Sequence, residues 1–212
     1  MLDTRILIVG NAPLNTIPRG YYNVVFYFAN NAHIVNSVNT DNVYGVIQNF
    51  TIDAKQWECP KWGKIREQKF FKYKTFFKSN YKTILIGKLV ESTAKYKIDF
   101  NIIEEVTHKF IVSHVLRNIP FTRLISVLGL RGCVNYLLLL LNLKSTVSGK
   151  YRPSSGYFIA LYASSIFKNS NIELVGFSDP RKEYIVTSEV VLKNSPHAKV
   201  DSLIFNQLKQ NR

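Results

Sequence analysis

The stretch that decides the fold is residues 152–177, which read RPSSGYFIALYASSIFKNSNIELVGF. It begins with a polar loop that contains proline and glycine. An apolar helix is predicted from residue 157 to residue 167, and a buried strand is predicted over residues 172–177. A helix that leads into a buried strand is the repeating unit of α/β proteins, so this fold class is the first expectation.

The start of the predicted helix carries groups that suit an anion. Ser154 and Ser155 stand where a side-chain oxygen can accept from the free amides of the first turn, as an N-cap does. Gly156 lets another group approach the backbone closely. Free amides and the positive end of the helix dipole favour a bound phosphate. The same residues also fit an ordinary capped helix that has no ligand.

Four more apolar runs predict buried strands. They are Arg5–Gly10, Val24–Phe28, Val43–Ile47 and Thr83–Gly87. A last helix is predicted around residues 203–208, whereas residues 95–118 give no clear pattern. Together these elements predict an α/β fold with a single Rossmann-like, doubly wound and mainly parallel sheet that has helices on both faces.

Length and charge limit the classes of function. A chain of 212 residues suits one domain with a sizeable core, over residues 1–212. The formal net charge is +14, and no Asp or Glu occurs between Glu105 and Glu173. Such a balance predicts an anionic partner, which is a nucleic acid, a phosphorylated ligand or an anionic membrane surface.

A basic, aromatic-rich subregion covers residues 55–150, and we assign it to acceptor or membrane contact. Over residues 55–82, Lys and Arg interleave with Trp, Phe and Tyr, which predicts an amphipathic helix with a solvated basic face. Single-stranded nucleic acid also suits this pattern, but no recognition motif accompanies it, so nucleic acid is disfavoured as a partner. Residues 119–143 are mainly apolar and predict either a buried helix or a basic, apolar element in the headgroup region of a membrane.

The sequence predicts no metal and no cofactor. His108 and His114 lie six residues apart and do not share a helix face well, and no D-x-D pair is present to hold Mg²⁺. Motifs of the G-x-G-x-x-G and P-loop types are also absent. Only two distant cysteines and an N-terminus without an apolar signal core predict a cytoplasmic location. No uninterrupted apolar run reaches the roughly 20 residues that span a bilayer.

Two pieces of the sequence resemble the sialylmotifs of sialyltransferases. Residues 8–13, IVGNAP, followed by Asn30-Asn31-Ala32 after a Phe-rich strand, resemble the large sialylmotif, in which a glycine-asparagine turn precedes a strand that ends near an asparagine. Residues 152–156, together with Val175-Gly176-Phe177, resemble the small sialylmotif. These pieces occur in the order of the family. Cys59 and Cys133 do not match the disulfide pair of its secreted animal enzymes, which fits a bacterial member.

A third piece completes the resemblance. His197 precedes the last predicted helix, as the histidine of the very small motif does, and the carboxylate of Asp201 follows it. Asp201 lies four residues after the histidine, whereas the family usually has a glutamate five residues after. The segment Phe28-Ala29-Asn30 lacks the family's arginine, and residues 55–150 contain no motif that can be aligned.

The resemblance implies an inverting, metal-independent glycosyltransferase without a cofactor. Its donor is a CMP-sugar that carries sialic acid, a related nonulosonate or Kdo, and its acceptor is a hydroxyl of a surface glycan or glycolipid, as in lipopolysaccharide or capsule synthesis. His197 is the implied general base, and Asp201 orients its ring. Peripheral contact with an anionic inner membrane would bring the chain to such acceptors. The implied donor-binding residues are Gly10, Asn11, Ala12, Asn30, Asn31, Ser154, Ser155 and Gly156.

Two other functions stay open at this point. One is a non-catalytic basic module that binds nucleic acid or an anionic membrane, with an affinity that falls steeply as salt is added. The other is an α/β enzyme of a different class that uses UDP, GDP or NAD.

Overall fold

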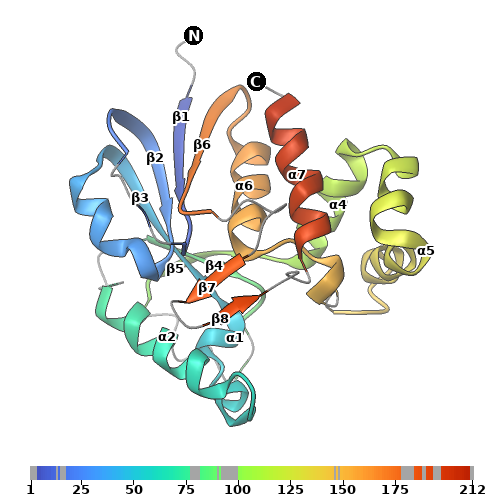
Figure 1. The fold of residues 1–212 in the computed structure, drawn as a ribbon, viewed down its shortest axis with the longest axis horizontal. Coiled ribbons are helices and arrows are strands. Elements are labelled where there is room, and N and C mark those ends of the chain that lie inside the picture. The colour runs from blue at the N-terminus through green and yellow to red at the C-terminus, as the bar shows by residue number, and fades with distance from the viewer. Residues whose placement is uncertain are drawn as a thin grey trace. The chain divides into compact units, whose positions relative to one another are not determined.

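The computed structural model divides the chain into two compact units, which are described separately (Figure 1). The sheet unit comprises Met1–Val106 and Asn169–Phe177, and the helical unit comprises Thr107–Lys168 and Ser178–Arg212. The expectation of one domain over residues 1–212 stays a prediction. The structure describes residues 4–12, 14, 18–76, 82–89, 91, 100–145, 147, 149–177, 184–187, 190–192 and 197–210.

The sheet unit is built on six parallel strands in the order β5-β4-β3-β2-β1-β6. This sheet confirms the predicted α/β, Rossmann-like class, and all five predicted strands are present. The sixth, β5, was not predicted because the three residues at its centre are exposed, which removes the apolar run. The strands are β1 Thr4–Val9, β2 Tyr21–Tyr27, β3 Asn39–Gln48, β4 Lys82–Ile86, β5 Ile102–Val106 and β6 Ser170–Val175.

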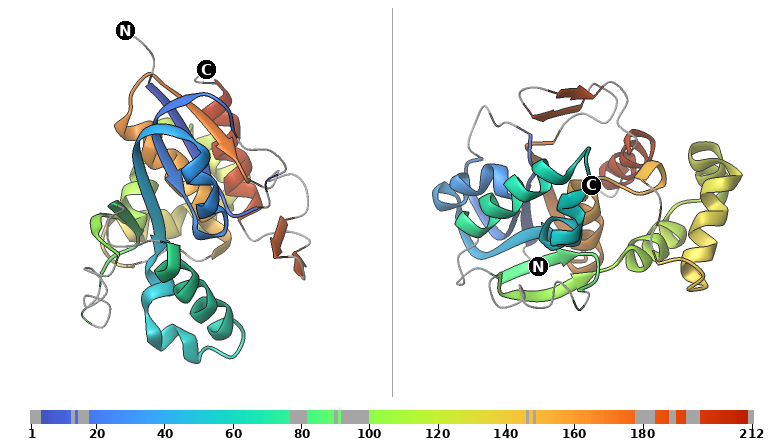
Figure 2. Two further views of the ribbon diagram at one scale, coloured as in Figure 1. Left: turned by 90° about the vertical axis from the view of Figure 1, so that its left-hand side faces the viewer. Right: turned by 90° about the horizontal axis from the view of Figure 1, so that it is seen from below.

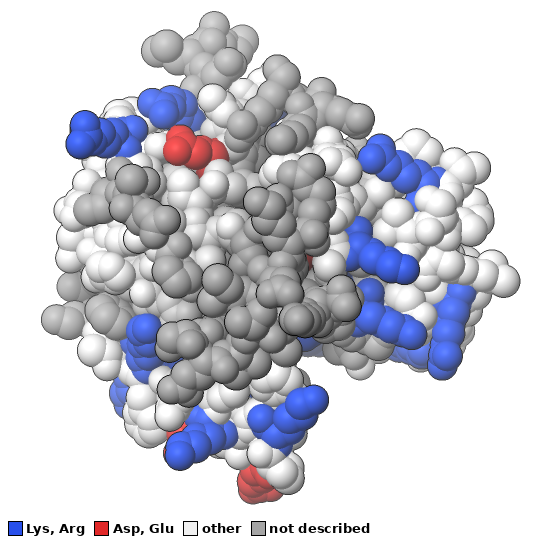
Figure 3. Space-filling view, viewed as in Figure 1, with Lys and Arg blue, Asp and Glu red and all other residues white. Residues whose placement is uncertain are grey.

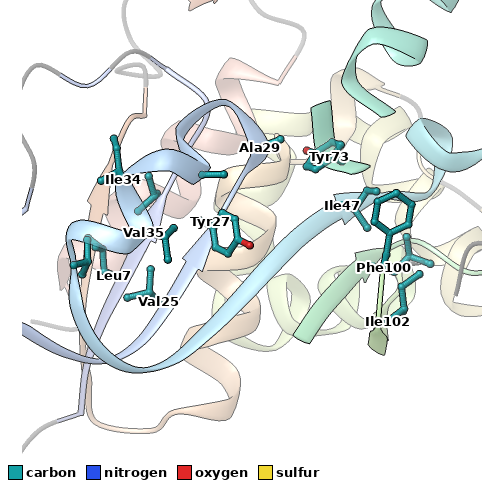
Figure 4. Packing of buried hydrophobic residues seen from close by; sticks show 14 of the residues in the cluster. Leu7, Val25, Tyr27, Ala29, Ile34, Val35, Ile47, Tyr73, Phe100 and Ile102 are labelled. Atoms are coloured by element: carbon teal, nitrogen blue, oxygen red, sulfur yellow. The ribbon is translucent and has the colours of Figure 1, made fainter. Parts of the chain in front are cut away.

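Short helices connect the strands and cover the core of the sheet unit. They are η1 Ala29–Ser37, α1 Asn49–Ile52, η2 Ala54–Glu58 and α2 Gly63–Phe76. Figure 4 shows Leu7 and Val25 of the sheet packed near Ile34 and Val35 of η1. Figure 2 shows η1 beside α2, and the two helices are in contact.

A helix, α2, forms within residues 55–82 as predicted, but its apolar face is narrow, since Phe71 is 55% exposed. Phe70 and Tyr73, three residues apart on one face, are each only 4% exposed and belong to the core. Lys64, Lys72 and Lys74 are exposed to solvent. The segment 77–81, which completes the aromatic pattern, lies outside the described residues.

The helical unit contains four longer helices. The predicted apolar helix is α6, in which every residue from 157 to 163 is buried, and the predicted last helix is α7. Helix α4 was not predicted; it begins after Thr107, whose side chain accepts a hydrogen bond from the amide of Phe110. The elements are α4 His108–Asn118, α5 Phe121–Leu140, η3 Gly149–Tyr151, α6 Ser155–Ile166, the antiparallel pair β7 Tyr184–Thr187 and β8 Val190–Leu192, and α7 Ala198–Gln210.

The prediction that residues 119–143 form a buried helix is correct for only one face of α5. Gly129 has φ 67° and ψ 171°, which interrupts the helix. Large apolar side chains on the other face are 38% to 71% exposed. By length and composition α5 is the one candidate membrane span among the described residues, a criterion that core helices of soluble proteins also meet. The exposed large apolar side chains within α5 are Phe121, Ile125, Leu130, Val134 and Leu137.

The order of the strands reverses between β1 and β6. The chain proceeds outward from β1 to β5 and then returns to place β6 on the other side of β1 (Figure 1). Open α/β sheets bind ligands beyond the carboxyl ends of the strands at such a switch point. The Gly10 amide donates to the Val175 carbonyl and the Ala12 amide donates to the Gly176 carbonyl, both at 2.8 Å.

The two strand ends approach each other so closely that glycine is required. A Cβ on Gly10 would lie 2.3 Å from the carbonyl oxygen of Gly176, which is backbone and cannot move aside. Gly176 itself has a φ of 67°, a conformation that side chains with a Cβ rarely adopt. The glycines of the two predicted motifs are therefore direct structural partners.

We expect Gly10→Ala to lower the free energy of unfolding by at least about 2 kcal/mol, because the new methyl group overlaps the Gly176 carbonyl. Urea unfolding followed by circular dichroism measures this loss. Gly129→Ala is the control: Gly129, unlike Gly10, has a positive φ, but its surroundings are open, so we expect only about 1 kcal/mol of backbone strain. Equal losses in the two variants would show that close packing at Gly10 is not the constraint.

Candidate functional site

Asn31 holds the turn that follows β1. Its Nδ2 donates to the carbonyl of Gly10 at 2.6 Å and to the carbonyl of Ala12 at 2.9 Å. The residue is only 5% exposed, so these bonds are made in a nearly dry environment. The amide nitrogen predicted to contact the donor is thus engaged in shaping the turn. We call Gly10, Asn11, Ala12, Asn30 and Asn31 the switch-point turn.

Asn11 and Asn30 form the more accessible side of the switch-point turn. The Asn30 amide donates to Asn11 Oδ1 at 3.4 Å, and Asn30 Nδ2 donates to the Asn11 carbonyl at 3.3 Å. Lys72 of α2 donates from Nζ to Asn30 Oδ1 at 3.1 Å. A cation therefore reaches the switch-point turn from the basic face of α2, which suits an anionic ligand. The sequence places Lys72 in a basic helix but does not reveal this contact.

Ser154 occupies the N-cap position of α6, but it does not cap the helix with its hydroxyl as predicted. Its carbonyl accepts from the Phe158 amide at 2.9 Å, and its own amide donates to Asp201 Oδ1 at 2.8 Å. Asp201 is fully buried in the first turn of α7. A carboxylate from another helix thus accepts from the backbone amide of the N-cap residue itself, which is a different donor from the first-turn amides that the hydroxyl was expected to cap. Ser155 and Gly156 follow in the first turn and are half-buried.

His197 directly precedes α7 and is held by the loop before α6. Its Nδ1 lies 2.9 Å from the carbonyl oxygen of Arg152. A carbonyl only accepts, so Nδ1 carries the proton in this contact, and the lone pair of the neutral ring lies on Nε2. The Asp201 amide donates to the His197 carbonyl at 3.0 Å. The orienting role given to the Asp201 carboxylate stays a prediction, and the Arg152 carbonyl is a partner that sequence patterns cannot reveal.

His108 lies in the same unit, at the start of α4. Its ring packs edge-on against Phe158, with centroids 5.7 Å apart. Burial, with a smaller contribution from the positive charge of Arg152, lowers the pKa of His108 to about 4, so this ring is neutral at pH 7. Among the described residues, no group of three or more His, Cys, Asp or Glu side chains is placed to hold a metal ion.

The predicted site residues therefore form two clusters. The switch-point turn belongs to the sheet unit, whereas Ser154, Ser155, Gly156, His197 and Asp201 belong to the helical unit. Within each unit, hydrogen bonds join residues that are far apart in the sequence, such as Asn31 to Gly10 and Asp201 to Ser154. The roles that the resemblance assigns to them stay predictions.

Comparisons with known proteins do not assign the chain to a family. No family model matches it, and neither the curated proteins nor the solved structures contain a match.

Asn31→Asp should destabilise the sheet unit by about 3 kcal/mol, because a buried carboxylate would face two carbonyl oxygens and donate nothing to them. Lowering the pH should recover part of the loss, since a protonated carboxyl can again donate. Chemical unfolding at neutral and acid pH measures both effects. Asn30→Asp is the matched control, and it should cost much less, because Asn30 is half-buried, donates to one carbonyl rather than two, and would keep its contact with Lys72. A stable Asn31→Asp variant at neutral pH would contradict the role given to the Asn31 amide.

His108 makes the stability of the helical unit depend on pH. Its pKa is about 4 in the folded chain and 6.5 as the reference value for the unfolded chain, so between these values the unfolded chain binds the proton more tightly. The free energy of unfolding has its full value above about pH 6.5 and declines as the pH falls toward 4, by up to about 3 kcal/mol.

Thermal or urea unfolding across this pH range measures the decline. His108→Gln should make the dependence shallower, whereas His33→Gln, a change at an exposed histidine, should leave it as it is. An unchanged profile in the His108→Gln variant would refute the assignment.

Proposed function

We propose that the chain is a sialyltransferase-like glycosyltransferase that moves a sugar from a CMP-sugar to a hydroxyl of a glycan. The observation that carries the proposal is the hydrogen bond between His197 Nδ1 and the Arg152 carbonyl. It selects the tautomer that a general base needs, with its lone pair on Nε2. The fold class supports the proposal, because Rossmann-like sheets bind nucleotides at their switch points.

The proposed reaction is a single displacement. The acceptor hydroxyl oxygen attacks the anomeric carbon from the face opposite the phosphate and forms the new glycosidic bond. The bond between the anomeric carbon and the phosphate oxygen breaks, and CMP departs with the electron pair. Nε2 of His197 accepts the hydroxyl proton as the bond forms.

Both units contain groups that suit an anionic donor. Asn11 and Asn30 offer polar groups beside the Lys72 ammonium, which balances negative charge without a metal. The amides of Ser155 and Gly156 lie at the start of α6, where the helix dipole favours phosphate. The Ser154 amide is already bound to Asp201, so we assign no donor contact to it.

His197 variants test the base directly. His197→Ala and His197→Asn should both lower the release of CMP from CMP-sialic acid or CMP-Kdo by at least about a hundredfold, because neither side chain can accept the proton. The asparagine variant can still donate to the Arg152 carbonyl. It therefore separates the loss of the base from the loss of the contact that holds the loop before α6. Circular dichroism verifies that each variant is folded. Full activity in a folded His197→Asn variant would refute the proposal.

A non-catalytic basic module is the second candidate, and the acid-free stretch between Glu105 and Glu173 favours it. Such a module would bind polyanions in a salt-dependent way and would not bind CMP. Calorimetry with CMP separates the two candidates, and thermal shifts with CMP, UDP, GDP and NAD identify another nucleotide class. Stabilisation by UDP or NAD, but not by CMP, would remove the leading candidate. We place either activity in the cytoplasm.

A further inference from the structure

The second half of α5 presents an apolar face to solvent. Leu130, Val134, Leu137 and Leu141 follow one another at spacings of four, three and four residues, so they share one side of the helix. Their exposed fractions are 71%, 43%, 48% and 67%. We call these four residues the docking face. Scattered exposed leucines need no explanation, but a continuous row of them marks a surface that another apolar phase covers.

The opposite side of the same helix is fixed to the protein. Gly132, Cys133, Tyr136 and Leu139 are buried, and the Tyr136 hydroxyl donates to the Tyr151 carbonyl at 2.6 Å. Helix α5 also contacts α4 and α7. The docking face is therefore held outward by a packed helix, and it does not result from a loose segment.

Basic and polar side chains flank the docking face. Arg131 is exposed one residue beyond Leu130, and Lys144 donates to Asn135. Lys109 of α4 donates to Asn142 at 2.9 Å, just after the end of α5. The visible surface over α4 and α5 shows Lys and Arg without Asp or Glu (Figure 3). An apolar row beside cations is the pattern of helices that lie in the interface of an anionic membrane.

The charge also argues against a second copy of the chain as the occupant. Two docking faces in a symmetric contact would bring equivalent cations together. No Asp or Glu occurs between Glu105 and Glu173 to balance them. An anionic lipid surface supplies both the apolar phase and the opposite charge.

The kink at Gly129 indicates that α5 lies on the membrane and does not cross it. Gly129 leaves the helical conformation in the middle of α5, and such a break exposed to lipid leaves backbone polar groups that the hydrocarbon cannot satisfy. One side of α5 is also packed against protein. We propose that α5 is a monotopic element whose docking face enters the headgroup boundary of an anionic bilayer. This proposal does not depend on the proposed transfer activity.

Vesicle sedimentation of the full chain tests the proposal. The chain should bind vesicles of phosphatidylcholine and phosphatidylglycerol but bind pure phosphatidylcholine much more weakly. Leu130→Ser, Leu137→Ser and Leu141→Ser combined should weaken binding to the anionic vesicles by at least about tenfold. Arg131→Gln with Lys144→Gln should weaken binding to the anionic vesicles and reduce its dependence on salt. The matched control replaces two exposed apolar residues outside residues 55–150, Tyr21→Ser and Ile166→Ser, and should leave the binding unchanged.

A second readout does not rely on weakened binding. Leu137→Trp places an indole on the docking face, and its emission should shift to the blue when anionic vesicles are added, relative to the unsubstituted chain. Unchanged binding in the triple serine variant, or no shift from Leu137→Trp, would overturn the proposal. Light scattering without lipid measures the oligomeric state. A dimer that the triple serine variant abolishes would contradict the proposal, because the docking face would then be an interface between copies of the chain.

Discussion

The sheet unit depends on the contact between the ends of β1 and β6. Two amide-to-carbonyl hydrogen bonds of 2.8 Å join segments from opposite ends of the chain, and they form only because Gly10 has no Cβ. This contact places β1 inside the sheet and β6 at its edge. It also creates the switch point, so the position at which a ligand is expected follows from one steric requirement.

The switch-point turn shows how a polar side chain can be structural and still define a site. Asn31 uses one amide nitrogen to bind two carbonyls, which satisfies backbone groups in a buried turn. Asn11 and Asn30 are then presented on the accessible side, beside the Lys72 ammonium. A buried residue that fixes the turn, with polar groups on its accessible side, is the arrangement expected of a binding site.

In the helical unit, a buried carboxylate also binds a backbone group. Asp201 is buried, and its oxygen accepts from the Ser154 amide at the start of α6. The carbonyl two residues before Ser154, that of Arg152, orients the His197 ring. Asp201 therefore binds the backbone of the loop before α6, and its role toward the His197 ring stays a prediction.

The amino-acid sequence by itself determined the fold class, because strands buried on both faces and helices buried through their centre leave unbroken apolar runs, as in β1 and residues 157–163 of α6. It did not determine β5, because the central residues of that strand are exposed and form no apolar run. It also did not determine which face of α5 meets solvent, because the sequence does not show whether a neighbour covers an apolar side chain. The candidate residues were visible as motifs, but their bonding was not. Only tertiary structure decided that Asp201 binds the Ser154 amide and that Arg152 sets the tautomer of His197, since both contacts join segments more than forty residues apart.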